Sequence, residues 1–256
     1  MKSLITFIKK EFLGQIRSVK LIILVALFVL FGIMNPAIAK ITPWLFELLE
    51  DVLAESGMAI TNLQVSAMDS WVQFFKNIPM ALIVFVILEG TILTKEYSSG
   101  TLILSLTKGL ERFKVLISKI TVLIIVWSLC YWLCFAITYF GNMLFWDNSI
   151  AQNLAFSAIC WWLFGMFIIS LIALFSTAGK SIAAVLLGTG GAVFAFSIIG
   201  LIPKINRFLP TMLTDGNSLV YGLLKVEDYL PSFAITIALT VICLAVSIPI
   251  FNKKQL

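Results

Sequence analysis

Histidine is absent from this chain of 256 residues, and charged residues make up only 12% of it. The absence of histidine excludes histidine-based acid–base chemistry and histidine-ligated metal sites. Soluble proteins carry about 25% charged residues, so this chain has too few charges to cover a surface that faces water on every side. We therefore expect lipid to be part of its solvent.

Cysteine is also scarce, because the chain has only Cys130, Cys134, Cys160 and Cys243, each within an apolar run. Cys130 and Cys134 have the spacing of one helical turn, but no second pair of cysteines or histidines completes a metal site. We interpret all four as small residues that face lipid or the protein core. No metal site is expected.

Hydrophobic residues make up 61% of the chain, and the mean hydropathy is +1.06. A helix that crosses a membrane needs about 20 mostly apolar residues. The sequence contains six such runs and no boundary between domains, so we predict an all-α integral membrane protein that forms one domain over residues 1–256. The predicted spans are residues 21–39, 77–93, 115–140, 150–175, 181–202 and 233–251.

Basic residues lie mainly in every second connection of this arrangement, which is typical of membrane topology rather than nucleic-acid binding. They gather in residues 1–20, 95–119 and 253–254 and at Lys180, whereas most acidic residues lie in the other connections. Because cytoplasmic segments carry the excess of lysine and arginine, both termini are predicted to be cytoplasmic. The basic N-terminal run is followed by no clear cleavage site, so we interpret the first apolar run as a retained span.

Three segments outside the spans have features of their own. Residues 1–18 place apolar side chains at helical spacing between basic ones, which predicts an amphipathic helix in the cytoplasmic interface. Residues 40–76 and 203–232 are predicted to be extracellular. The first includes an amphipathic stretch over residues 43–58, and the second is broken by prolines and glycines into short helices.

Residues 95–114, between the second and third spans, form a predicted cytoplasmic excursion. Leu102, Leu106 and Leu110 recur at helical spacing, with charged residues and a glycine at each side. Such a helix can dock in a groove of a partner protein, but an ordinary solvated connection has the same spacing. The Gly179-Lys180-Ser181 triplet follows Leu174, where a phosphate-binding loop needs glycine, so no ATP site is predicted within this chain.

The string from Glu96 through Gly100-Thr101-Leu102 resembles the E-x-x-x-G-T-L signature of ABC-2-type permeases, the membrane subunits of ABC exporters. The resemblance extends to the order of the six spans, the N-terminal helix and the segment between spans two and three. It implies that residues 95–114 contain a coupling helix that contacts a separate ATPase subunit. The coupling residues that it implies are Glu96, Gly100, Thr101, Leu102, Leu106 and Arg112.

The same resemblance implies the assembly and its cofactors. Two copies of the ATPase would bind ATP and magnesium, and this chain would bind no cofactor and catalyse no reaction itself. Six spans are half of a twelve-span unit, so a homodimer or a heterodimer with a similar permease is implied.

Glu89 is the acidic residue that falls inside a predicted span, where a charge is costly and tends to face the bundle interior. It would serve as a gate or cargo contact, with Phe85 and Trp127 beside it in a cavity, or it would simply pair with Lys95 or Lys119. In span five, Gly188, Gly190 and Gly191 favour close helix packing, either within the chain or between subunits.

The sequence thus predicts a multi-pass protein of a bacterial plasma membrane that exports an amphipathic peptide, antibiotic or lipid-like molecule. The apolar and aromatic cavity walls favour such cargo, and the chain looks similar to permeases for bacteriocins, lantibiotics and phenol-soluble modulins. Two other classes remain open. An ion channel or secondary transporter would show several buried charges, and a membrane-embedded enzyme would show a catalytic cluster at the membrane face.

Overall fold

A computed structural model describes residues 2–48, 64–100 and 111–254 of the chain. Within these ranges the protein is helical, and six helices are long and apolar enough to cross a membrane. They are α2 (Val19–Leu48), α4 (Ala67–Glu89), α7 (Arg112–Met143), α8 (Leu154–Ala178), α9 (Ile182–Ile199) and α12 (Val226–Lys253). The predicted all-α class is therefore confirmed, with six helices that could span a membrane.

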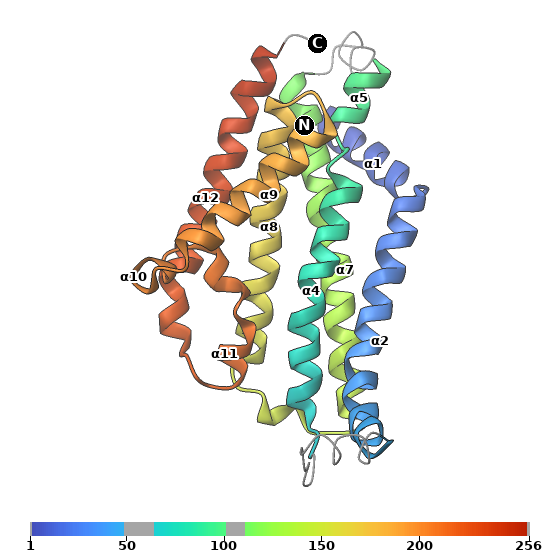
Figure 1. Ribbon diagram of the computed structural model, residues 1–256. Helices are drawn as coiled ribbons and strands as arrows, with labels where there is room; N and C mark the ends of the chain where they lie inside the picture. The colour runs from blue at the N-terminus through green and yellow to red at the C-terminus, as the bar shows by residue number, and fades with distance from the viewer. Residues whose placement is uncertain (1, 49–63, 101–110, 255–256) are drawn as a thin grey trace.

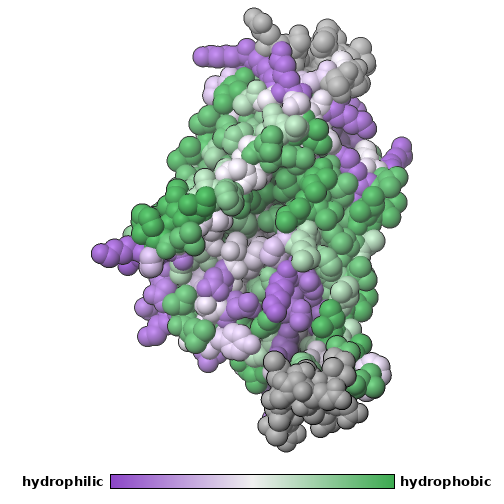
Figure 2. All heavy atoms as spheres, viewed as in Figure 1, coloured by the Kyte–Doolittle hydropathy of each residue, from purple (hydrophilic) through white to green (hydrophobic). Residues whose placement is uncertain are grey.

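The long helices run side by side in one bundle (Figure 1). Helices α2, α4 and α7 pack on one another, α8 lies in the centre, and α12 packs on α8. The two chain ends, α1 (Lys2–Ile16) and α5 (Thr94–Ser99) all lie at the same end of the bundle, which we call the terminal end (Figure 1). Hydrophilic residues gather at the terminal end, at the top of the view, and again in the lower half of the visible face (Figure 2). A hydrophobic band lies between them.

The predicted N-terminal helix is present as α1, which packs on α7 and α2. Phe7 is buried, and Ile8 and Phe12 pack against the core. Ile5 and Ile16 of the same helix are exposed. A helix that is apolar toward the bundle and apolar again toward its surroundings fits a position at a membrane interface.

Two predicted span boundaries were wrong, because both helices begin well before their apolar runs. Helix α4 begins at Ala67 rather than Asn77, since Ser66 and Asp69 form a capping box there. The added turns bury Trp71, while Lys76 stays exposed on the opposite side. Likewise, α12 begins at Val226 rather than Phe233, with Asp228 bonded to the backbone at its start.

The predicted extracellular segments are also organised differently. Residues 43–48, the first part of the predicted amphipathic stretch over residues 43–58, continue α2, which contains Pro36 and Pro43. Residues 49–63 lie outside the described part of the chain. Neighbouring helices allow prolines inside membrane helices.

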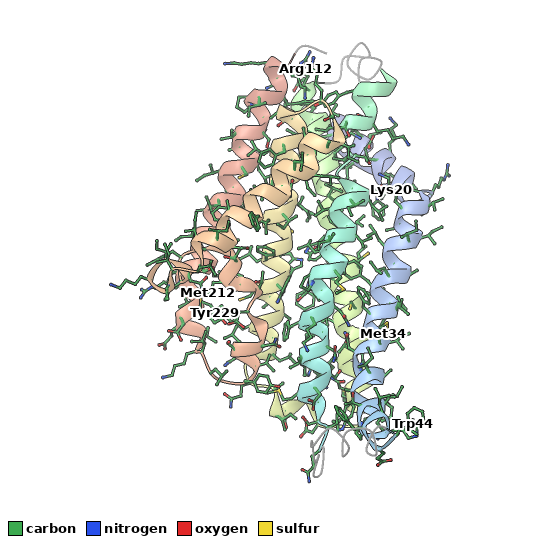
Figure 3. All side chains as sticks on the ribbon, in the orientation of Figure 1. Lys20, Met34, Trp44, Arg112, Met212 and Tyr229 are labelled. Carbon is green, nitrogen blue, oxygen red and sulfur yellow. The ribbon has the colours of Figure 1, made fainter. Side chains whose placement is uncertain are left out.

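The segment after α9 forms short helices as predicted: α10 (Pro203–Asn206), the 3₁₀ turn η2 (Pro210–Thr214) and α11 (Gly216–Val220). Both η2 and α11 pack on α8 rather than projecting beyond the spans. Met212 of η2 and Tyr229 of α12 lie close together at this side of the bundle (Figure 3). The connection between α7 and α8 contains the short 3₁₀ turn η1 (Asn148–Ile150).

Candidate functional site

Glu89 lies at the last turn of α4, at the terminal end of the bundle, and is only 2% exposed. Its carboxylate accepts a hydrogen bond from the side-chain amide of Gln15, at the end of α1. A buried carboxylate is stable only when it is hydrogen-bonded and compensated by positive charge. The carboxylate therefore ties α1 to α4 at the point where α4 leaves the bundle.

Lys20, in the first turn of α2, supplies positive charge to the same place (Figure 3). Its ammonium donates to the Leu88 carbonyl at 2.6 Å and to the Thr91 hydroxyl. Thr91 in turn donates to the Leu88 carbonyl at 3.1 Å. Lys20 thus bonds one of the carbonyl groups that α4 leaves without a helical partner at its C-terminal end.

Lys119 of α7 is the centre of a second, adjoining cluster. Its ammonium lies 2.9 Å from a Glu11 oxygen of α1 and 2.7 Å from a Glu96 oxygen of α5. The lysine is 4% exposed, and the two carboxylates are partly shielded from solvent. One buried cation between two carboxylates therefore holds α1, α5 and α7 together.

The sequence offered Lys95 or Lys119 as a partner for Glu89, and in the structure Lys119 is bonded to other carboxylates. Lys119 is held by Glu11 and Glu96, whereas Glu89 is held by Gln15. No pattern in the sequence pointed to Gln15, Glu11 or Lys20, because each lies about 70 or more residues from its partner. The packing of α1 on α7 and of α2 on α4 brings these groups together.

Arg112, at the first residue of α7, lies at the same end of the molecule (Figure 3). Its guanidinium donates to three carbonyl groups at the C-terminal end of α12: Phe251 at 3.2 Å, Asn252 at 3.4 Å and Lys254 at 2.5 Å. The last carbonyls of a helix have no partners within the helix and carry partial negative charge. Arg112 therefore joins the start of α7 to the end of α12.

Lys254 continues this connection to α8. Its ammonium donates to the Thr177 carbonyl at 2.8 Å and to the Gly179 carbonyl at the end of α8, and it lies 4.2 Å from the centre of the Tyr97 ring. Burial, with a smaller contribution from the nearby Lys180, lowers the pKa of the Lys254 ammonium. Tyr97 of α5 also donates to the Ser176 carbonyl at 3.3 Å. Through these bonds α5, α7, α8 and α12 meet.

Of the coupling residues implied by the resemblance, the structure describes Glu96, Gly100 and Arg112. Gly100 ends α5 with a φ of 67°, in the left-handed region that favours glycine. Thr101, Leu102 and Leu106 lie outside the described residues. Glu96 belongs to the Lys119 cluster, and Arg112 is bonded to the end of α12. Residues 101–110, between them in the sequence, lie outside the described part of the chain.

Phe85 and Trp127 are fully buried, and their ring centres are 5.4 Å apart. The Trp127 indole donates to the Trp162 carbonyl at 3.1 Å, and Gly165 packs directly against the indole ring. Both side chains belong to the packed core between α4, α7 and α8, and neither lines the groove described next.

A groove with a volume of about 680 Å³ runs along α4, α8, α9 and η2. Its position is marked by the hydrophobic face between α9 and α4 in Figure 2. Its walls are apolar, with Phe75, Trp161 and Phe164 among the aromatic members.

The three glycines of α9 have different surroundings. Gly188 packs against the Phe175 ring of α8, as close helix packing within the chain requires. Gly190 lines the groove, and neither Gly190 nor Gly191 has an atom near the position that a Cβ would occupy. The glycine motif therefore serves packing within the chain at one position and leaves open surface at the other two.

Among the described residues, no group of three or more acidic, cysteine or histidine side chains is placed to hold a metal ion. No family model matches the chain, and no curated protein matches it. What the fold and composition do identify is a multi-span helical membrane protein.

Proposed function

We propose that this chain is the permease subunit of an ATP-driven exporter of the ABC-2 type. Two separate ATPase subunits would supply the energy, using ATP and magnesium, and a second permease of the same or similar sequence would complete the channel. The terminal end of the bundle would face the cytoplasm of a bacterial cell, and this chain would perform no chemistry itself.

The observation that carries the proposal is the way in which the segment after α4 is bonded to the rest of the bundle. Glu96 is paired with Lys119, which also holds α1, and Tyr97 and Arg112 are bonded to the ends of α8 and α12. A force applied to this segment would therefore be transmitted to α1, α7, α8 and α12 together. Such two-state coupling between a cytoplasmic contact and a membrane groove is what an ATP-driven permease requires.

The groove supports export of an amphipathic cargo, such as a peptide, an antibiotic or a lipid-like molecule. Its walls combine apolar and aromatic side chains with a few hydroxyl groups, and none of the described residues that line it is charged. Ligand sites are typically apolar cavities of about 300–1,000 Å³ with a few polar groups, and the groove falls within this range. A sugar or a free ion would find too few polar partners there.

The experiment is co-expression of the full chain with a candidate ATP-binding cassette protein from the same organism, followed by co-purification and ATPase assays in proteoliposomes. Glu96→Gln removes one carboxylate from Lys119, so we expect the complex to assemble but the permease to stimulate the ATPase less. Glu111→Gln is the matched control, because Glu111 pairs only with the more exposed Lys114 in the described part of the chain.

Equal stimulation by the Glu96→Gln and wild-type chains would contradict the proposed coupling path. Cargo transport by the purified chain without an ATPase, or no association with any nucleotide-hydrolysing partner, would contradict the function itself.

A further inference from the structure

The groove along α4, α8 and α9 holds polar groups whose hydrogen bonds are missing. Six buried side-chain atoms in the described part of the chain lack a hydrogen-bond partner, and three of them belong to groove residues: the Trp161 indole N–H and the Thr189 and Thr211 hydroxyls. Trp161 and Thr189 are only 3% and 2% exposed. Buried polar groups are normally hydrogen-bonded. Three of the six exceptions belong to one groove, which indicates that a molecule from outside the chain supplies their partner.

Comparable side chains elsewhere in the bundle do have partners. The buried Trp71 indole donates to Asn148, and the Trp162 indole donates to Ser128, each at 3.0 Å. The Thr236 hydroxyl donates to the Ser232 carbonyl within its own helix. Thr189 is also inside a helix but does not make this bond. The missing bonds of Trp161, Thr189 and Thr211 therefore do not follow from their residue types.

The shape and chemistry of the groove restrict what could supply the missing bonds. On α4 it extends from Phe75 to Ile87, a distance of about 18 Å at the rise of an α-helix. This length and the apolar walls suit an extended apolar chain. The Trp161 indole can only donate a hydrogen bond, and the two hydroxyls can donate as well, so the occupant needs an acceptor. The absence of charged residues from the lining favours an uncharged acceptor, such as an amide or ester carbonyl.

We propose that this groove is a binding site for an amphipathic molecule with an apolar chain and a carbonyl acceptor, and that Trp161, Thr189 and Thr211 bind its polar groups. The three atoms are themselves covered from solvent, so small side-chain rotations accompany binding, as is common at binding sites. That the bound molecule is the exported cargo rests on the proposed function. The binding site itself does not.

The test uses the full chain without an ATPase, in phosphatidylcholine nanodiscs. The probe is N-dodecanoyl glycinamide with a photoreactive diazirine on its acyl chain, and labelled residues are identified by mass spectrometry. We expect labels on α4, α8 and α9 along the groove. Trp161→Phe and Thr189→Val should each raise the probe concentration at half-saturation about fivefold, which corresponds to the loss of one neutral hydrogen bond.

Trp162→Phe is the matched control, because it removes the neighbouring indole N–H, which already has a partner in Ser128. Trp162→Phe should lower thermal stability and leave probe binding unchanged. Trp161→Phe should weaken probe binding and leave thermal stability unchanged. Gly190→Phe should abolish labelling, since a large side chain at this open position would fill the groove.

Unchanged affinity in both Trp161→Phe and Thr189→Val would overturn the proposal. Labels confined to the outer faces of α2 or α12 would also overturn it, as would cross-links showing that a second copy of the chain fills the groove. If labelling follows the groove but no ATPase associates with the chain, the site stands and the exporter function fails. If an ATPase is coupled to the chain but the probe does not label the groove, the exporter function stands and the binding site fails.

Discussion

The three helices α2, α4 and α7, which we call the packed group, and the pair α9 and α12, which we call the open pair, are all strongly apolar but are held in place differently. In the packed group, polar side chains bond between helices: Asn77 donates to Asn35 at 2.7 Å, and Asn35 donates to Thr138 at 2.9 Å. In the open pair, Ser197 of α9 and Thr240 of α12 donate to carbonyls of their own helices, and α12 is bonded to other elements toward its two ends, at Ser232 and Lys254. Hydropathy alone therefore does not determine how firmly a span is fixed.

The open pair leaves much apolar surface uncovered. Leu187 and Phe194 of α9 are 76% and 68% exposed, and this surface continues into the groove. In lipid there is no hydrophobic driving force between helices, so close packing and interhelical hydrogen bonds decide which spans are fixed. Burial and interhelical bonding therefore distinguish α9, which is largely exposed, from α2, which is bonded to both α4 and α7.

The largest expected effect is at Lys119, where the packed group meets α1 and α5. Lys119→Met leaves the Glu11 and Glu96 carboxylates without their shared cation, and breaking a buried ion pair in this way costs about 3 kcal/mol. We expect a large fall in thermal stability in detergent micelles. Lys114→Met is the control, since the more exposed Lys114–Glu111 pair contributes about 1 kcal/mol or less. Equal stabilities of the two variants would show that the Lys119 cluster contributes no more to stability than the exposed Lys114–Glu111 pair.

A smaller effect is expected from adding one methyl group at two glycines. In Gly165→Ala the new Cβ would overlap the Trp127 indole, and overpacking of this kind costs about 1–3 kcal/mol. In Gly190→Ala the Cβ meets nothing, and alanine favours the helix by about 1 kcal/mol. Thermal unfolding should therefore shift down for the first variant and stay level or rise for the second. A comparable loss in both would show that the open pair is packed more tightly than described.

The smallest effect tests the interhelical hydrogen bonds. Asn35→Leu deprives the Asn77 amide and the Thr138 hydroxyl of a shared partner, and such bonds in membranes contribute about 1 kcal/mol. Thr240→Val removes only a bond within α12 and should change the free energy of unfolding by less than about 0.5 kcal/mol. The measurement is reversible unfolding in mixed micelles. If Thr240→Val were the more damaging change, the distinction between the two regions would be wrong.

The sequence by itself determined the helical class, the six spans and the broken segment after α9, because the need to keep a backbone in lipid fully hydrogen-bonded leaves few alternatives. It placed the starts of α4 and α12 too late, since apolar runs do not register capping boxes such as Ser66 with Asp69. It also pointed to Glu89, Glu96 and Arg112 as residues of interest, but not to what they contact.

The tertiary structure alone decided the contacts at the terminal end and along the groove. Gln15 reaches Glu89, and Lys254 reaches the end of α8, across more than 70 residues of sequence, because packing brings helix ends together. Composition treats Trp161 and Trp162 alike, yet only Trp162 has a hydrogen-bond partner for its indole. Hydrogen-bond satisfaction depends on neighbours in space, and a linear pattern of residue types does not contain that information.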